Sequence, residues 1–401
     1  MNQDHIDENH ESNASPLRPL QRRRRGAWKH GIIAGLCLYF FLSAINIMGE
    51  GLKYVGDAGD WLQRIFAHGD NPFVALLGAV FVTAVVQSSS FTTALIITLV
   101  ASGQISLATA VFAIMGANIG TSVTGVIVSL GNIRIRRQFR RAFTAALMHD
   151  IFNLVTVAVL FPLELITGAF HPDGRGWLTL TAMRLTDLIG APEVENPNSP
   201  VKVITRPMVN LVDGVGGLFT ASPLLKGIII AIIGLVLLFT ALVFMVKNLK
   251  GALLSRVEGL FRTYFFRNDF TSYVVGVIST VLVQASTITT SLIVPLAGAG
   301  VVKLKRVFAF MLGANLGTTF TGVIAATANP VSAAVTVALF HVMFNLIGTA
   351  IWYPLRIVPM GLARWYGRLA AESKRYAFIF LFAVFVVIPV IGLIITEVFF
   401  M

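Results

Sequence analysis

The chain has 401 residues, of which 56% are hydrophobic and 12% are charged, and its mean hydropathy is +0.79. A soluble protein carries about twice that share of charged residues, so the composition excludes an ordinary soluble domain and indicates a helical protein that crosses the membrane several times. The net charge of +12 does not indicate nucleic acid as a partner, because Lys and Arg gather in loops between apolar runs. The single cysteine, Cys37, excludes a disulfide framework and a cysteine metal site.

The N-terminal residues 1–30 are polar and then basic, and they predict a disordered cytoplasmic tail. Residues 31–49 form the first apolar run, and no small-residue cleavage site follows it. We therefore expect a retained first helix rather than a cleaved signal peptide. The chain is predicted to be a multi-pass protein of the inner (plasma) membrane, with its N-terminus in the cytoplasm.

Residues 31–163 are predicted to form the first of two repeats. Within them, residues 72–102 are apolar except around Gln87–Ser90, which predicts a re-entrant hairpin of two short helices that meet at a polar tip. Residues 106–130 predict a transmembrane helix that is broken at Gly116–Ser122. An Arg-rich run then marks a cytoplasmic loop, and residues 143–163 cross the membrane again.

Residues 164–221 carry charges of both signs and a Pro/Asn-rich run, and they predict an extracytoplasmic linker loop. Residues 222–354 form the second predicted repeat, with a hairpin at 269–300 and a broken helix at 303–328. The remaining residues, 355–401, predict an interfacial segment followed by a C-terminal transmembrane helix.

The two repeats are related by a constant offset. Gln87 pairs with Gln284, 197 residues later, and the same offset pairs Asn118 with Asn315. From Gln87 to Gly125, 16 of 39 positions are identical, which is too many for chance similarity of apolar sequence. The cationic loops fall at opposite points of the two copies, so the copies are predicted to have inverted topology. The predicted fold class is therefore all-α and polytopic, with two inverted repeats.

The repeated polar tip predicts a transport site. Lipid offers no hydrogen bonds, so a polar group that is left unpaired there costs several kcal/mol. Hydroxyl, amide and carbonyl oxygens suit sodium, whereas the N-terminus of a helix favours an anion. The alternative is that the hydroxyls bond back to their own helices or pack between helices. The duplication, with Gln in both copies, favours the site.

Other polar residues in the apolar runs can be interpreted either as packing residues or as functional residues. The glycines around Asn118 and Asn315 permit either close helix packing or an unwound turn, and the two amides are predicted to contact ions or a gate. A His/Asn pair lies on one helical face in each repeat, and we interpret these pairs as a polar seam rather than a proton-coupling or metal site. No pattern of catalytic residues is present, so an enzyme is not expected. The His/Asn pairs are His149 with Asn153 and His341 with Asn345.

The motifs VVQSSSFTT, GANIGTSVTG, VQASTITT and GANLGTTFTG, with FRRAF, HDIFNL and FPLE at 139–164, resemble the type II sodium/phosphate cotransporter family, in particular its bacterial members. The resemblance covers about residues 70–355. It implies secondary active uptake of inorganic phosphate, coupled to inward sodium, and an inverted-repeat fold in which two re-entrant hairpins meet at the substrate. No cofactor is implied beyond co-transported sodium.

The resemblance also implies roles for individual residues. The two tips would bind phosphate, and nearby hydroxyls and amides would bind sodium. Ala285 departs from the family's QSSS pattern, which leaves the number of ligands at the second tip open. The implied phosphate-binding residues are Gln87, Ser88, Ser89, Ser90, Gln284, Ala285, Ser286 and Thr287. The implied sodium-binding residues are Ser89, Thr92, Thr93, Asn118, Thr121, Ser286, Thr289, Thr290, Asn315 and Thr318.

Several alternatives stay open at this point. A protein of the same build could carry another small anion, such as sulfate or a carboxylate. A passive anion channel or a membrane scaffold would belong to a different functional class. A homodimer is one arrangement that the sequence allows.

Overall fold

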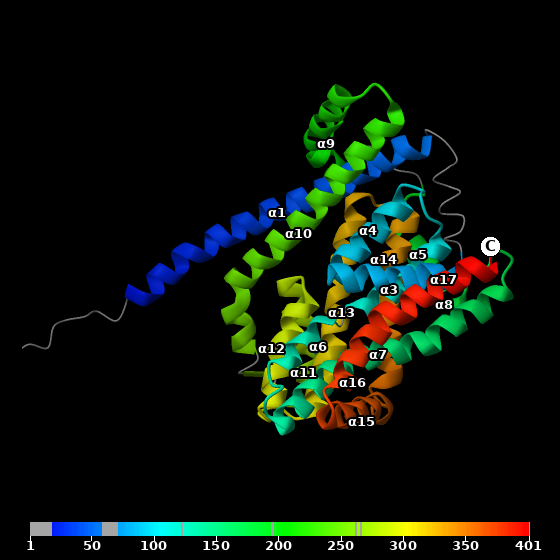
Figure 1. The fold of residues 1–401 in the computed structure, drawn as a ribbon. Helices are drawn as coiled ribbons and strands as arrows, with labels where there is room; N and C mark the ends of the chain where they lie inside the picture. Colours follow the sequence, from blue (N-terminus) through cyan, green and yellow to red (C-terminus); the bar gives the residue numbers. More distant parts are fainter. Residues whose placement is uncertain are drawn as a thin grey trace, which may run out of the picture.

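The computed structural model describes residues 18–57, 71–121, 123–193, 196, 198–260, 263–264 and 267–400. In this part of the chain all regular secondary structure is helical, in agreement with the predicted all-α fold. Of the predicted disordered tail, residues 1–17 lie outside the described residues, whereas residues 18–30 are helical and begin α1, which differs from the prediction. The helices build one body, from which two long helices, α1 (Arg18–Asp57) and α10 (Pro223–Leu260), extend to one side (Figure 1).

The other elements follow in chain order. They are α3 (Pro72–Val86), α4 (Ser89–Ala101), α5 (Leu107–Gly120), α6 (Val123–Leu130), α7 (Arg136–Ala169), α8 (Trp177–Ile189), α9 (Pro200–Phe219), α11 (Asp269–Val283), α12 (Ser286–Gly298), α13 (Leu304–Ala328), α14 (Ser332–Trp352), α15 (Ile357–Glu372), α16 (Arg375–Phe382), the π-helix η3 (Ala383–Val387) and α17 (Ile388–Phe400).

Seven helices in the described part of the chain are long and apolar enough to cross a membrane. Four further apolar helices, α3, α4, α11 and α12, have only 13 or 15 residues each. At 1.5 Å per residue they are about 20–23 Å long, shorter than the roughly 30 Å of hydrocarbon in a bilayer. They form two helical hairpins, α3–α4 and α11–α12, within residues 72–102 and 269–300. That these hairpins re-enter the membrane stays a prediction. The seven helices of membrane-spanning length are Ile32–Asp57, Leu107–Leu130, Arg136–Ala169, Pro223–Lys250, Leu304–Ala328, Ser332–Trp352 and Arg375–Thr396.

Glycine allows the first leg of each hairpin to pack tightly on the following helix. A Cβ atom at Gly116 of α5 would lie 2.1 Å from the carbonyl oxygen of Leu76 in α3. A Cβ atom at Gly313 of α13 would lie 2.0 Å from the carbonyl oxygen of Tyr273 in α11. Both contacts obey the offset of 197 residues, so the two halves repeat in packing as well as in sequence. Close packing is therefore the role of these glycines.

The structure differs from the prediction of a broken helix in the second repeat. The first repeat has the break, because α5 ends at Gly120 and α6 starts at Val123. In the second repeat α13 is continuous from Leu304 to Ala328. The glycines Gly313 and Gly317 suggest an unwound turn in the sequence. In the structure both residues lie where α13 approaches α11 closely, and an α-helix needs no break for such an approach.

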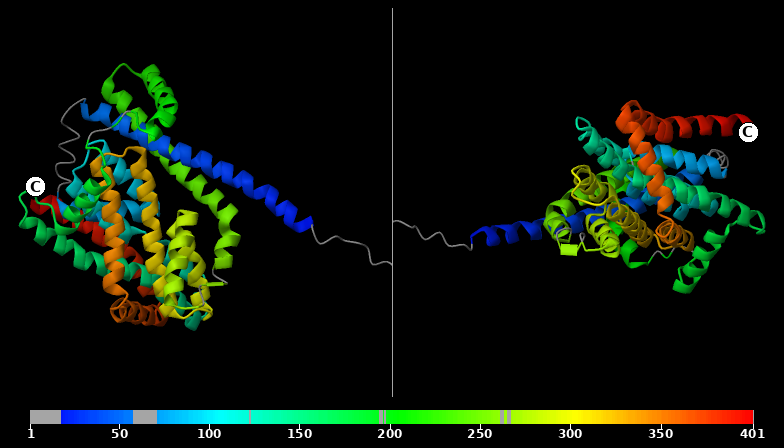
Figure 2. Two further views of the ribbon diagram at one scale, coloured as in Figure 1. Left: turned by 180° about the vertical axis from the view of Figure 1, so that it is seen from behind. Right: turned by 90° about the horizontal axis from the view of Figure 1, so that it is seen from below.

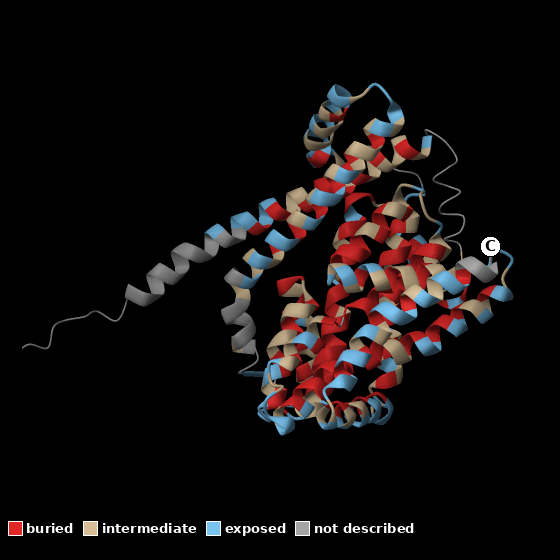
Figure 3. Ribbon diagram, in the orientation of Figure 1, coloured by how far each residue is buried: buried red, intermediate tan, exposed pale blue. Residues whose placement is uncertain are grey.

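The two halves interleave rather than lying apart. The second leg of each hairpin packs on the other half, since α4 contacts α13 and α14, and α12 contacts α6 and α7. Buried residues concentrate in this body, including Phe143 and Phe152 of α7 and Phe308 and Phe310 of α13 (Figure 3). The interleaving brings the tips of both hairpins to the interior.

The long helices α1 and α10 pack against each other along much of their length, and α9 lies against both (Figure 2). Glycine again permits a close approach, since a Cβ atom at Gly234 would lie 2.6 Å from the backbone nitrogen of Met48. Large apolar side chains on α10, such as Ile232, Val236 and Phe244, are exposed. An apolar exposed face on a helix of this length is suited to lipid.

Residues 164–221, predicted as a linker loop, contain the end of α7 and two further helices, α8 and α9. The sequence at the start of α9 favours helix initiation. The Ser199 hydroxyl accepts a hydrogen bond from the backbone N–H of Lys202 as an N-cap, and Pro200 is the first helical residue. The Pro/Asn-rich run that suggested a loop is the connection between α8 and α9 rather than the whole segment.

Candidate functional site

Each hairpin turns at a glutamine in the left-handed conformation. Gln87 has φ 55° and ψ 31°, and Gln284 has φ 58° and ψ 23°. Among the described residues these are the two non-glycine positions with positive φ. A side chain in this region costs roughly 1–2 kcal/mol relative to glycine, and such strain is often kept at functional sites. The backbone N–H of each Gln donates to a carbonyl oxygen one turn back, Thr83 or Thr280, at 2.7 Å.

The residue after each glutamine is extended and begins the second leg of the hairpin. The Ser88 hydroxyl caps α4 by accepting a hydrogen bond from the N–H of Phe91 at 3.3 Å. Ala285 has no hydroxyl, so α12 begins without a side-chain cap. The first N–H groups of α12 are therefore left to another acceptor, and an anion would fill that role.

A pair of threonines ties the two legs of each hairpin together. The Thr83 hydroxyl donates to the hydroxyl of Thr92 at 3.0 Å, and the hydroxyls of Thr280 and Thr289 are 2.9 Å apart. Thr92 and Thr289 also donate to carbonyl oxygens of their own helices. Both residues were predicted as sodium ligands, and in this structure their hydroxyls hold the hairpins together.

The two tips meet in the interior of the body. The Ser90 hydroxyl in the first tip donates to the carbonyl oxygen of Gln284 in the second at 3.5 Å. The Thr321 hydroxyl of α13 donates to Gln284 Oε1 at 3.0 Å and lies 3.4 Å from Ser90 Oγ. In the first repeat, the Thr124 hydroxyl of α6 donates to Gln87 Oε1 at 3.2 Å. A threonine at the same repeat position therefore orients each glutamine.

Both tips line one cavity of about 230 Å³. All eight residues predicted to bind phosphate line it, together with Thr121 and an apolar wall from α10. None of the described residues that line it has a charged side chain. An anion in this cavity would therefore meet helix N-termini, hydroxyls and amides, but no formal positive charge to balance its own charge. The α10 residues are Phe239, Leu242, Val243 and Val246.

The residues predicted to bind sodium are not gathered at a single point. Ser89, Thr121 and Ser286 line the tip cavity. Thr121 and Thr290 also line a separate space of about 10 Å³, about the size of a single water. Thr93 is buried, and within the described residues its hydroxyl has no hydrogen-bond partner. Thr318 donates to the carbonyl oxygen of Ala314, as Thr121 does to that of Ala117, both at 2.9 Å.

The amides of Asn118 and Asn315 join the halves instead of lining the tip cavity. His149 Nε2 of α7 lies 2.6 Å from Asn315 Oδ1 in the second repeat. His341 Nε2 of α14 lies 3.3 Å from Asn118 Oδ1 in the first. Asn153 adds bonds to both amide residues, at 2.8 Å and 3.1 Å. The polar seam predicted for the His/Asn faces is confirmed, and its partners are these two asparagines.

The sequence reading missed two kinds of site residue. Thr124 and Thr321, which orient the glutamines, are 197 residues apart, so the repeat offset itself could have identified them. The apolar residues of α10 carry no such signal, because their part in the cavity follows only from the packing of α10 beside the tips.

Known transport proteins resemble this chain over most of its length. The family model described as Na+/Pi-cotransporter matches residues 40–168 and 237–363. Sodium-dependent phosphate transport protein 2A of Rattus norvegicus is 31% identical over 416 residues, which cover 88% of this chain and 65% of that protein. Sodium-dependent phosphate transport protein 2B of Homo sapiens is 30% identical over 436 residues, which cover 88% of this chain and 63% of that protein. No solved structure matches the chain significantly.

The chain thus spans less than two thirds of the length of these relatives. The family model covers well over half of the chain in two segments. Seven apolar helices of membrane-spanning length agree with a transporter family. The chain belongs to the Na+/Pi-cotransporter family.

Proposed function

We propose that the protein is a secondary active transporter that takes up inorganic phosphate together with sodium. The observation that carries this proposal is the tip cavity, which is lined by two helix N-termini and their hydroxyls, with no charged side chain among the described lining residues. A phosphate anion in such a place needs cations to balance it, because a buried unpaired charge is very costly. Sodium would supply that balance, which couples the two solutes.

Phosphate would lie between the N-termini of α4 and α12. Its ligands would be the residues of the two tips, and Thr124 and Thr321 would hold Gln87 and Gln284 in place. Sodium would bind beside the tips, with Ser89, Thr93, Thr121, Ser286 and Thr290 as the oxygen ligands that the structure favours. Thr92, Asn118, Thr289, Asn315 and Thr318 would then support the site through the hydrogen bonds described above.

The membrane potential sets a minimum for the coupling. Moving one charge across a membrane changes the free energy by about 2.3 kcal/mol per 100 mV. At least two sodium ions are needed to carry a phosphate dianion without net charge. Sodium is expected to bind first, because it lowers the repulsion that phosphate would meet at the carbonyl and hydroxyl oxygens of the tips.

The hairpins would move as a unit with the helices on which they pack. We propose that residues 71–131 and 268–328 shift against a scaffold that includes α1 and α10. The position of the tip cavity supports this division, because the tips form one wall and α10 forms the other. Cysteine crosslinks between a hairpin and α10, with and without sodium and phosphate, test the movement, and an unchanged pattern would contradict it.

The topology is part of the same proposal. The N-terminus would be cytoplasmic, the membrane would be the inner (plasma) membrane, and the hairpins would enter it from opposite sides as inverted repeats. The partners would be phosphate, sodium and lipid, with a homodimer as a possible assembly and no enzymatic activity. Extracellular labelling of single cysteines placed in α9 and α15 would test the topology.

The decisive experiment is uptake of labelled phosphate into liposomes that contain the protein. Saturable uptake in sodium, lost in choline, is expected, and Gln87→Ala should abolish it. Gln104→Ala is the matched control, because Gln104 lies in the loop after α4, away from the tips. Unlabelled sulfate and carboxylates should not compete. Uptake that persists in choline would indicate a channel, and full competition by sulfate would indicate another anion.

A further inference from the structure

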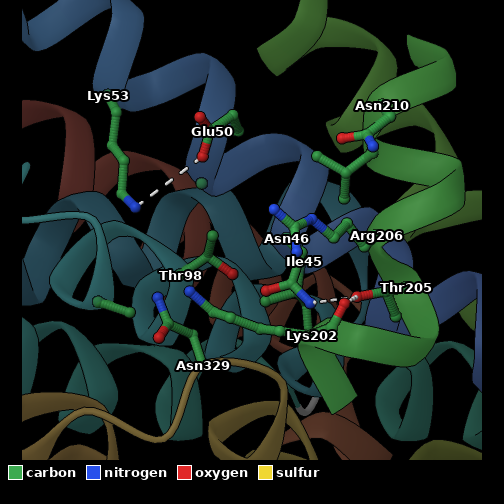
Figure 4. A pocket seen from close by; sticks show the side chains of 13 residues that line it. Ile45, Asn46, Glu50, Lys53, Thr98, Lys202, Thr205, Arg206, Asn210 and Asn329 are labelled. Carbon is green, nitrogen blue, oxygen red and sulfur yellow. Dashed lines mark hydrogen bonds and ion pairs between the residues drawn. The ribbon is translucent and has the colours of Figure 1, made fainter. Parts of the chain in front are cut away.

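A second cavity, of about 430 Å³, lies between α1, α4, α9 and the C-terminal end of α13 (Figure 4). It shares no lining residue with the tip cavity. Its polar lining comes from elements far apart in the sequence. Its principal polar residues are Glu50, Lys53, Thr98, Lys202, Arg206 and Asn329.

The lining of this cavity is strongly basic. Three cations, Lys53, Lys202 and Arg206, face one carboxylate, Glu50, which lies 3.9 Å from Lys53 Nζ. The pKa of Lys202 is lowered to about 8, first by burial and then by the charge of Lys53, while Glu50 opposes the shift. An anion bound here would raise the pKa again, because its negative charge would stabilise the charged form of Lys202 and offset the charge of Lys53.

Asn329 provides a second and independent indication of a ligand. This residue follows α13, is only 8% exposed, and within the described residues its Oδ1 has no hydrogen-bond partner. A buried amide oxygen without a hydrogen-bond partner is unusual, because such atoms are costly to leave unpaired. Figure 4 shows the amide beside the ammonium of Lys202. Because Oδ1 only accepts hydrogen bonds, the part of a phosphate ion that it can bind is the P–OH group of hydrogenphosphate.

The cavity lies at the far end of two helices that lead to the tips. Thr98 is nine residues beyond Ser89 on α4, and Asn329 is eight residues beyond Thr321 on α13. At 1.5 Å per residue, about 12–14 Å separates each pair along the helix axis. The helices α4 and α13 pack against each other. The cavity and the tips therefore lie at two different levels of the same helix pair.

We propose that this cavity is a separate recruitment site that binds inorganic phosphate without sodium, before phosphate moves to the tips. The inference rests on the proposed phosphate transport and adds a second site to it. The two cavities differ in their need for sodium because they differ in charge. A basic cavity can capture an anion by itself, whereas the neutral tip cavity needs sodium. With a cytoplasmic N-terminus, the recruitment site faces the extracytoplasmic side, from which phosphate is taken up.

The test measures how fast an amine reagent modifies Lys202 in the full chain, in nanodiscs of zwitterionic lipid and in choline buffer at pH 8. Only the uncharged amine reacts, and bound phosphate should raise the pKa of Lys202. A rise from about 8 to about 9 lowers the uncharged fraction at pH 8 about fivefold. Mass spectrometry should therefore show slower modification of Lys202 when inorganic phosphate is added, and Lys247, exposed on α10, should be unaffected.

Three results would overturn the proposal. The first is an unchanged rate of modification at Lys202, and the second is equal protection of Lys247. The third is that anionic lipid in the nanodiscs protects Lys202 and that added phosphate gives no further protection, because this result would assign the cavity to a lipid headgroup. The measurement needs no transport, so it stands even if the protein moves another solute. In uptake assays, Lys202→Met should raise the KM for phosphate while the maximal rate stays close to wild type. Arg184→Met, which removes an exposed charge on α8, should leave the KM unchanged, and equal effects of the two variants would contradict the site.

Discussion

The hydroxyl of Ser90 lies 3.5 Å from the backbone carbonyl oxygen of Gln284, although the two residues are 194 positions apart in the chain. This contact joins the tips of two hairpins that belong to different repeats. It means that neither repeat forms the cavity alone. A change at one tip should therefore alter the ligand environment of the other.

Replacing Gln87 by glycine should separate stability from transport. Glycine adopts the left-handed conformation without a steric penalty, so Gln87→Gly should stabilise the fold by about 1 kcal/mol. The same change removes a side chain that lines the tip cavity, so sodium-dependent phosphate uptake should be lost. Thermal unfolding of the purified protein and liposome uptake give the two values. A variant that transports normally would show that the glutamine side chain has no role in binding.

Thr321→Val should weaken phosphate binding while preserving side-chain shape. The valine cannot donate to Gln284 Oε1 or contact Ser90 Oγ through a hydroxyl. Loss of one or two such bonds corresponds to about 1–2 kcal/mol, or about 5- to 30-fold in the dissociation constant. Thr327→Val is the control, because Thr327 is exposed on the same helix and bonds only to the carbonyl oxygen of Ile324. Equal binding constants for both variants would show that Thr321 does not position the tips.

Gly313→Ala should destabilise the protein, whereas Gly78→Ala should not. The new methyl at 313 would lie 2.0 Å from the carbonyl oxygen of Tyr273, so α11 and α13 would have to separate. Overpacking of this kind costs about 1–3 kcal/mol or more. At Gly78, on α3, a Cβ atom meets nothing within 4 Å, and alanine favours the helix. The melting temperatures should differ in that order, and similar values would contradict the close packing of the helices.

Phosphate recruitment should weaken as the pH rises through about 8. The ordinary pKa of a lysine is 10.5, and that of Lys202 is lowered to about 8, so its charge is present below pH 8 and is lost above it. The charged groups that face it are Lys53 and Glu50 from α1 and Arg206 on α9, and α4 and α13 contribute only neutral residues. Lys202→Arg keeps its charge at all these pH values.

The ratio of the KM of Lys202→Arg to that of the wild type is the quantity to measure. It should be close to one at pH 7 and fall at pH 9, where only the arginine is still charged. Taking the ratio removes the effect of pH on phosphate itself, because both proteins meet the same mixture of ions. A ratio that does not change between pH 7 and pH 9 would show that Lys202 does not act through its charge.

The hairpins and their tips could be predicted from the sequence because the duplication marks them. Gln87 and Gln284 are polar residues in apolar runs, and their pairing at a fixed offset separates a site from incidental packing. The His/Asn faces could be interpreted for the same reason. Their partners could not be predicted, because the bonds of His149 to Asn315 and of His341 to Asn118 depend on how the halves interleave.

Other features depend on tertiary packing and left no mark in the sequence. Gly313 and Gly317 look alike whether a helix breaks or packs closely, and only the position of α11 decides between the two. Thr92 and Thr289 look like ligands until Thr83 and Thr280 are seen to bond to them. The basic cavity brings Lys53, Lys202 and Asn329 together from three distant segments, and none of the three belongs to a motif.

The most direct test of the central claim is the number of phosphates that bind per chain in the presence of sodium. Equilibrium binding of labelled phosphate, corrected for binding in choline, should give one sodium-dependent phosphate per chain. Gln87→Ala and Gln284→Ala should each abolish it, because the two tips share one cavity. Two sodium-dependent phosphates per chain, with each variant removing only one of them, would contradict a single site built by both hairpins.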